Sequence, residues 1–258
     1  YLAGRAVQAP DLADALAEKV ARRDQPLQSV QIEGALSTFP SMVLLGDPGA
    51  GKSTILKYLA VSSAKARTDE KAESPCRLPI ILPVAAYAAA LTRSGDLSIE
   101  NYLPDYYREV RGITDDLTAL FSSALASGKA LILLDGLDEV TDLNQRVFIA
   151  RRVQDFYNWH KARGNQFVIT SRIVGYDEAP LSAEGLTHFV MLDFSRDEIK
   201  QFVSNWCSAF EMASRGSSAT AHQSANDEQE RLLAAICSNS SVERLAANPL
   251  LLTILALI

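Results

Sequence analysis

The apolar residues of this chain gather in short runs that are separated by amphipathic segments. Two of these segments, 117–125 and 143–160, repeat apolar residues at the three- and four-residue spacing of a helix with one buried face. The runs themselves have the length and composition of buried strands: 42–45, 78–84, 130–134, 166–170 and 188–192. Strands that alternate with helices predict an α/β domain, in which helices cover both faces of a parallel sheet.

The pattern changes after residue 193, where the strand-like runs stop. Ser195 and Glu198 have the spacing of a capping box, and an amphipathic helix follows them. Residues 212–230 are rich in Ser, Ala, Gln, Asn and Gly, so we predict a mobile loop there, with helix resuming near Gln229.

A last helix start is marked by Asn248 and Pro249, a good N-cap residue followed by proline at the first helical position. We therefore expect three parts along the chain. These are a linker with a weak helix over 11–23, an α/β domain, and a small all-α helical subdomain, with boundaries at 1–25, 26–193 and 194–258.

The bulk composition is that of an ordinary globular protein. The 258 residues, 48% of them hydrophobic, suffice for one large α/β domain and a smaller appendage. The net charge is −6 and Lys and Arg form no cluster beyond isolated pairs, so we expect no direct contact with nucleic acid. The apolar run 250–258 is too short to span a bilayer and no charged-then-apolar leader opens the chain, so we expect a cytoplasmic protein with no membrane contact. Because the chain begins at Tyr1 and stops inside an apolar run, we expect a segment of a longer polypeptide.

The cysteines and histidines show no spacing typical of a disulfide framework or a zinc site. We expect the thiols to be buried among apolar residues and the imidazoles to have no catalytic role. The residues concerned are Cys76, Cys207, Cys237, His160, His188 and His222.

A glycine-rich segment connects the first predicted strand to a predicted helix. It matches the pattern G-x-x-x-x-G-K-[ST], in which a tight turn points successive backbone N–H groups into one concavity beside a helix N-terminus. Glycine is needed where the backbone approaches phosphate oxygens or takes a positive φ. We therefore predict that the chain binds a nucleoside triphosphate through Gly46, Asp47, Pro48, Gly49, Ala50, Gly51, Lys52, Ser53 and Thr54.

Two residues of this loop and one strand end have distinct predicted roles. Lys52 supplies a point charge for the β- and γ-phosphates, and the Ser53 hydroxyl is a ligand for Mg²⁺. The apolar run 130–134 ends at Asp135, which beside Ser53 would hold Mg²⁺ directly or through water.

Two further acids, Asp138 and Glu139, follow Asp135 after a glycine and a leucine. We favour Glu139 as the group that activates a water in line with the γ-phosphorus. Asp138 is the rival for that task, because the sequence leaves its direction undetermined. The alternative is that both are solvated loop acids or favourable charges at the start of the next helix.

Arg172 stands at the polar end of the run 166–170. In a doubly wound sheet we expect this end to lie between the glycine loop and the acids, where Arg172 could approach the γ-phosphate and sense its presence. The alternative is an exposed arginine in a surface ion pair.

Four segments together resemble the NACHT family of signal-transducing P-loop NTPases, particularly its bacterial members. They are GDPGAGKST at 46–54, LILLDGLDEV at 131–140, VITSR at 168–172 followed by Gly175 and Tyr176, and NPLLLTILAL at 248–257. The resemblance runs from about Pro26 to the end. A small residue directly after the magnesium-binding aspartate, with acids a few positions on, distinguishes this family from relatives that carry Glu immediately after that aspartate.

The resemblance implies a P-loop NTPase fold with a three-layer αβα arrangement and a five-stranded core, in which the strand before Arg172 lies between the strands ending at Leu45 and Leu134. It implies that Lys52, Ser53 and Asp135 bind phosphate and Mg²⁺, that Arg172 is the sensor, and that Pro249 lies against the adenine of ATP or ADP. The winged-helix region, the N-terminal effector and the C-terminal sensor repeats of such proteins are not in this sequence.

Three functions compete at this point. The leading hypothesis is a slowly hydrolysing molecular switch, closed with ADP and self-associating with ATP, in a bacterial defence or regulatory protein. The second is a continuously turning-over enzyme, either a motor ATPase or a small-molecule kinase. The third is a scaffold whose nucleotide is structural.

Overall fold

A computed structural model describes residues 5–8, 30–68, 77–216 and 218–258. The chain forms two compact units. The larger one, the sheet unit, consists of Arg5–Asp47 and Lys52–Met191. The smaller one, the helical unit, contains Pro48–Gly51 and Leu192–Ile258.

The sheet unit contains a seven-stranded sheet with the order β2-β1-β7-β3-β6-β5-β4. The strands from β7 to β4 are parallel, whereas β1 runs antiparallel to both β7 and β2. In chain order the strands are β1 (Arg5–Gln8), β2 (Val30–Gln31), β3 (Ser41–Leu45), β4 (Leu78–Pro83), β5 (Ala130–Asp135), β6 (Gln166–Ser171) and β7 (Thr187–Met191). This confirms the five-stranded parallel core and the place of β6 between β3 and β5.

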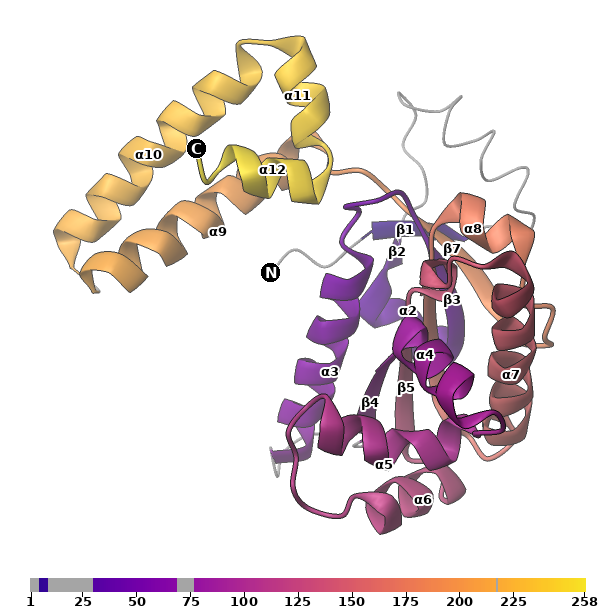
Figure 1. Cartoon of the computed structure of the whole chain (residues 1–258). Helices are drawn as coiled ribbons and strands as arrows, with labels where there is room; N and C mark the ends of the chain where they lie inside the picture. Colours follow the sequence, from indigo (N-terminus) through magenta and orange to yellow (C-terminus); the bar gives the residue numbers. More distant parts are fainter. Residues whose placement is uncertain (1–4, 9–29, 69–76, 217) are drawn as a thin grey trace. The chain divides into compact units, whose positions relative to one another are not determined.

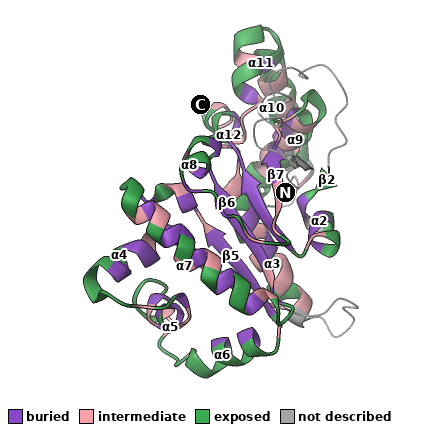
Figure 2. Cartoon of the chain, turned by 90° about the vertical axis from the view of Figure 1, so that its right-hand side faces the viewer, coloured by how far each residue is buried: buried purple, intermediate pink, exposed green. Residues whose placement is uncertain are grey.

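Helices cover both faces of the sheet, and α3 and α7 lie on opposite faces (Figures 1 and 2). The central strands β3, β5 and β6 are buried on both sides for this reason, and β3 is buried at every residue. The helices of this unit are α2 (Ile32–Thr38), α3 (Lys52–Thr68), α4 (Val84–Ser94), α5 (Ile99–Glu109), α6 (Thr118–Ala126), α7 (Leu143–Lys161) and α8 (Ile173–Glu178). The three-layer αβα arrangement is confirmed.

The predicted linker at 1–25 contains a strand. Residues Arg5–Gln8 form β1, and Ala6 is fully buried where it pairs with Met191 of β7. A four-residue strand with two apolar residues is too short to stand out in a hydrophobic pattern. The helix predicted over 11–23 lies outside the described residues.

The helical unit contains α9 (Arg196–Arg215), α10 (Ala219–Cys237), α11 (Ser240–Ala246) and α12 (Pro249–Leu255). The predicted capping box is present, because Ser195 accepts from the Glu198 N–H and Glu198 reaches back to the Ser195 backbone. The α9 and α10 helices pack side by side (Figure 1).

The mobile loop predicted at 212–230 is wrong, because α10 begins at Ala219. Its sequence is poor in large apolar residues but rich in Ala, Gln and Glu, which are good helix formers. A single row of contacts with α9, including the buried Ala225, is enough to hold such a helix.

Cys207 is buried in the core of this unit, whereas Cys237 is exposed, which corrects the expectation that all the thiols are buried. Both are free, and Cys76 lies outside the described residues. No helix in the described part of the chain is long and apolar enough to cross a membrane.

Candidate functional site

Asp135, at the carboxyl end of β5, accepts hydrogen bonds from two hydroxyl groups. Ser53, in the first turn of α3, donates to Asp135 Oδ1 at 3.0 Å, and Thr170 of β6 donates to the same oxygen at 2.8 Å. The parallel pairing of β5 with β6 carries Thr170 to this edge of the sheet. The structure thus brings together Ser53 and Asp135, the two residues predicted to hold Mg²⁺.

Thr170 was not predicted from the sequence to belong to the site. It is fully buried, and besides donating to Asp135 it accepts from the Gly136 N–H at 2.9 Å. Both contacts fix the direction of the Asp135 carboxylate. The available signal was a hydroxyl residue at the end of the otherwise apolar run before Ser171 and Arg172.

The glycine loop is anchored to the sheet at its start, where the Gly46 N–H donates to the Ser171 carbonyl at 3.3 Å. The Lys52 ammonium donates to the carbonyls of Gly46 at 2.7 Å and Asp47 at 3.1 Å. Burial lowers the pKa of Lys52, and the charge of Arg172 acts in the same direction, while neighbouring carboxylates raise it. A bound anion would favour the charged form of this ammonium.

Within the helical unit, Pro48–Gly51 contact the start of α12. Asn248 Nδ2 donates to the Pro48 carbonyl at 3.0 Å, and the Leu250 N–H donates to the Gly49 carbonyl at 3.2 Å. A methyl group on Gly49 would come within 2.7 Å of Asn248 Oδ1, and φ of Gly49 is +80°. Only glycine satisfies both conditions at this position.

The start of α12 matches its prediction. Asn248 is the N-cap, since its Oδ1 accepts from the N–H groups of Leu250 at 3.0 Å and Leu251 at 3.3 Å, and Pro249 is the first helical residue.

Glu139 folds back over a glycine after the end of β5. Gly136 has φ +74°, and a methyl group there would lie 2.6 Å from Cδ of Glu139. The Glu139 N–H donates to the Gly136 carbonyl at 3.1 Å, which closes the turn η1 (Leu137–Glu139). Burial raises the pKa of Glu139, as do the charges of Asp135 and Asp138, so its carboxylate is poised to accept a proton.

Asp138 has different surroundings from Glu139. Its Oδ1 accepts from the Arg172 N–H at 2.7 Å, and its Oδ2 lies 3.2 Å from Arg172 Nε. The Asp138 side chain is 7% exposed and that of Arg172 is 55% exposed. Both oxygens of Asp138 therefore face Arg172, whereas the guanidinium reaches solvent.

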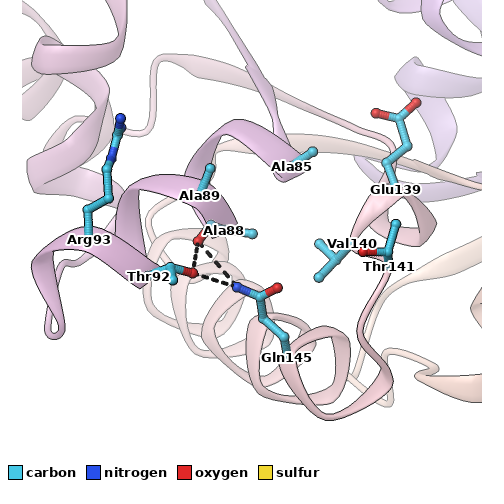
Figure 3. A pocket seen from close by; sticks show the side chains of 9 residues that line it. All are labelled: Ala85, Ala88, Ala89, Thr92, Arg93, Glu139, Val140, Thr141 and Gln145. Atoms are coloured by element: carbon cyan, nitrogen blue, oxygen red, sulfur yellow. Dashed lines mark hydrogen bonds between the residues drawn. The ribbon is translucent and has the colours of Figure 1, made fainter.

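A pocket of about 360 Å³ opens beside Glu139. Glu139 and Arg93 lie at opposite sides of it (Figure 3), and Gln145 donates to Thr92 Oγ1 at 2.8 Å on its wall. The remaining lining is small or apolar: Ala85, Ala88, Ala89, Val140 and Thr141. Glu139 is thus one of the residues that line a pocket with space for water.

The donor set around Asp135 fits a magnesium ion. A serine hydroxyl and a carboxylate oxygen within hydrogen-bonding distance are the hard oxygen ligands that Mg²⁺ takes from proteins when phosphates complete its shell. Ser53 and Asp135 are the residues that would hold it.

Comparisons with known proteins bear on the family. A crystal structure of a DNA replication initiation factor covers 84% of this chain and 80% of its own, at 13% identity and a TM-score of 0.35. No curated protein matches the chain. The family model of the NACHT domain matches residues 41–209, which run from the first residue of β3 into α9. The chain therefore belongs to the NACHT family of P-loop NTPases.

Proposed function

We propose that this chain binds ATP with Mg²⁺, hydrolyses it slowly, and acts as a nucleotide-dependent switch in signal transduction. The observation that carries the proposal is the contact between Ser53 of the glycine loop and Asp135 at the end of β5. A phosphate-binding loop and a magnesium-binding strand end must meet in this way for a metal-assisted NTPase.

The nucleotide and its ion are bound by separate groups. The N–H groups of the glycine loop and the Lys52 ammonium hold the phosphates, and Ser53 with Asp135 holds Mg²⁺. When bound, Mg²⁺ neutralises charge on the β- and γ-phosphate oxygens. Thr170 keeps the Asp135 carboxylate directed toward Ser53.

Glu139 is the general base in this proposal. Its raised pKa suits proton acceptance, and the pocket beside it has space for a water. Asp138 is less suited, because Arg172 engages both of its oxygens. Arg172 contacts the γ-phosphate through its exposed guanidinium and so distinguishes ATP from ADP.

Pro249 packs against the adenine in this proposal. Support comes from its neighbours within the helical unit, since Asn248 and Leu250 donate to the carbonyls of Pro48 and Gly49.

The switch works through differential binding. Reversing a 1:99 population takes about 5.5 kcal/mol of differential affinity between ATP-bound and ADP-bound states. The contacts of the γ-phosphate with Mg²⁺ and Arg172 supply this differential affinity if they are absent from the closed state. We infer that the chain acts in a bacterial defence or regulatory protein that self-associates on activation.

The test compares Lys52→Ala with Lys57→Ala, since Lys57 is an exposed lysine of the same helix. Calorimetry with ATP and ADP should show binding by wild type and Lys57→Ala and none by Lys52→Ala. Chromatography of the denatured wild-type protein should show retained nucleotide, and steady-state turnover should be slow. Unchanged affinity of Lys52→Ala would overturn the site, and fast turnover without retained nucleotide would favour a motor-type ATPase over a switch.

A further inference from the structure

We propose that Asp138 is a positioning residue, which holds Arg172 so that the chain distinguishes a nucleoside triphosphate from a diphosphate. The inference rests on the proposed function and assigns to the second acid of the cluster a role other than that of a base.

The carboxylate of Asp138 binds two different parts of Arg172. Its Oδ1 accepts the backbone N–H at 2.7 Å, and its Oδ2 lies 3.2 Å from the side-chain Nε. The first contact fixes where α8 begins, because Arg172 is the N-cap residue of that helix. The second fixes the direction in which the guanidinium leaves the backbone.

The neighbouring element is shaped to allow this approach. A methyl group on Gly175 would overlap the Cβ of Asp138, so α8 can lie against Asp138 only because residue 175 is glycine. Tyr176 also holds α8 in place, because its buried hydroxyl accepts from the Leu181 N–H at 3.0 Å and lies 2.7 Å from His188 Nε2. Arg172 therefore lies at the start of a helix that is held both by its approach to Asp138 and by the contacts of Tyr176.

The ion pair with Asp138 leaves the Nη groups of Arg172 accessible to a phosphate. Guanidinium has five N–H donors in a rigid fork, and the ion pair with Asp138 is closest at Nε. The two Nη groups remain on a side chain that is 55% exposed, and they are the donors that bind a phosphate bidentately. A carboxylate on Nε thus orients the fork without competing for the phosphate.

A base role for Asp138 would conflict with these contacts. A general base needs an oxygen within hydrogen-bonding distance of the attacking water, and the Asp138 side chain is 7% exposed with both oxygens engaged. Glu139 has an accessible pocket beside it. The two adjacent acids therefore have different tasks.

The experiment measures the affinities of ADP and of a non-hydrolysable ATP analogue, both with Mg²⁺, by calorimetry for Asp138→Asn, Asp138→Ala and Gly175→Ala. ADP affinity should stay within about 2-fold of wild type, while analogue affinity falls by about 10-fold or more in Asp138→Ala, as expected for loss of a charge-assisted contact. Asp138→Asn should lose less, because it keeps an acceptor for the Arg172 N–H. Gly175→Ala should lose discrimination although every charged group is retained.

The matched control is Asp116→Asn, which removes another carboxylate that accepts a backbone N–H, that of Thr118, outside the site. In an Arg172→Gln background, Asp138→Ala should change the ratio of the two affinities no further, because the two residues act as a unit.

Three results would overturn the inference. Unchanged affinities combined with lost single-turnover hydrolysis in Asp138→Asn would make Asp138 the base. Equal losses for ADP and the analogue with a lower melting temperature would make it a purely structural residue. An effect of Asp138→Ala that persists in the Arg172→Gln background would show that it does not act through Arg172. Absence of nucleotide binding by the wild type would instead defeat the proposed function itself.

Discussion

At the scale of single residues, three acids within five positions have three environments. Asp135 accepts two hydroxyl hydrogen bonds, Asp138 pairs with Arg172, and Glu139 lies over Gly136 beside a pocket. Substitution at each should therefore remove a different property.

The first prediction separates binding from hydrolysis. Glu139→Gln keeps size and hydrogen bonding but cannot accept a proton, so ATP should still bind while hydrolysis falls by about 10²- to 10⁴-fold. Asp135→Asn should weaken Mg²⁺-dependent binding itself. Single-turnover hydrolysis of prebound ATP checks both, and a Glu139→Gln rate equal to wild type would contradict the assignment.

The second prediction concerns pH. Because the pKa of Glu139 is raised in the folded chain, its protonated form favours folding, and that stability is lost as pH rises through the folded pKa. Glu139→Gln should therefore melt at a higher temperature than wild type at pH 7, and the difference should shrink as pH falls toward 4.5.

The hydrolysis rate should depend on pH in the opposite direction from stability. It should fall as the pH is lowered, because Glu139 becomes protonated. A wild-type profile with no acid limb above pH 4.5 would argue against this base.

At the scale of elements, the segments that were predicted correctly are those that are most deeply buried. Strands β3 and β5 are nearly continuous apolar runs because both of their faces are covered, and such runs are visible in sequence. The α10 helix was missed because its stability comes from backbone propensity and a single packed face, which its polar composition conceals. Thr170 was missed because its importance depends on a side-chain contact with Asp135, 35 residues away in sequence, which strand order alone does not reveal.

The third prediction tests α10. Asn226 is exposed in the interior of this helix, so proline there removes a backbone hydrogen bond without disturbing side-chain packing. Asn226→Pro should lower stability by about 3 kcal/mol, whereas Asn226→Ala should be neutral or slightly stabilising. Thermal unfolding followed by circular dichroism measures both. Equal stability of the two variants would show that this segment is a loop and not a stable helix.

At the scale of the whole molecule, nucleotide binding should be visible as stability. A ligand that binds only the folded chain stabilises it by about 2.7 kcal/mol at a concentration 100 times its Kd. We therefore predict that MgATP raises the melting temperature of the wild type and leaves Lys52→Ala unchanged. A similar shift in both proteins would mean that the ligand binds elsewhere.

The position of β3 in the sheet also governs how the chain is made. Both of its partners, β6 and β7, follow it by more than 100 residues, so β3 leaves the ribosome long before either exists. Synthesis at about 5 to 20 residues per second leaves this largely apolar strand unpaired for several seconds or more. A nascent strand of this kind can pair with other chains, and its closure must wait for distant partners, which slows folding. The central strand that carries the glycine loop is thus the segment for which a growing chain most needs a chaperone.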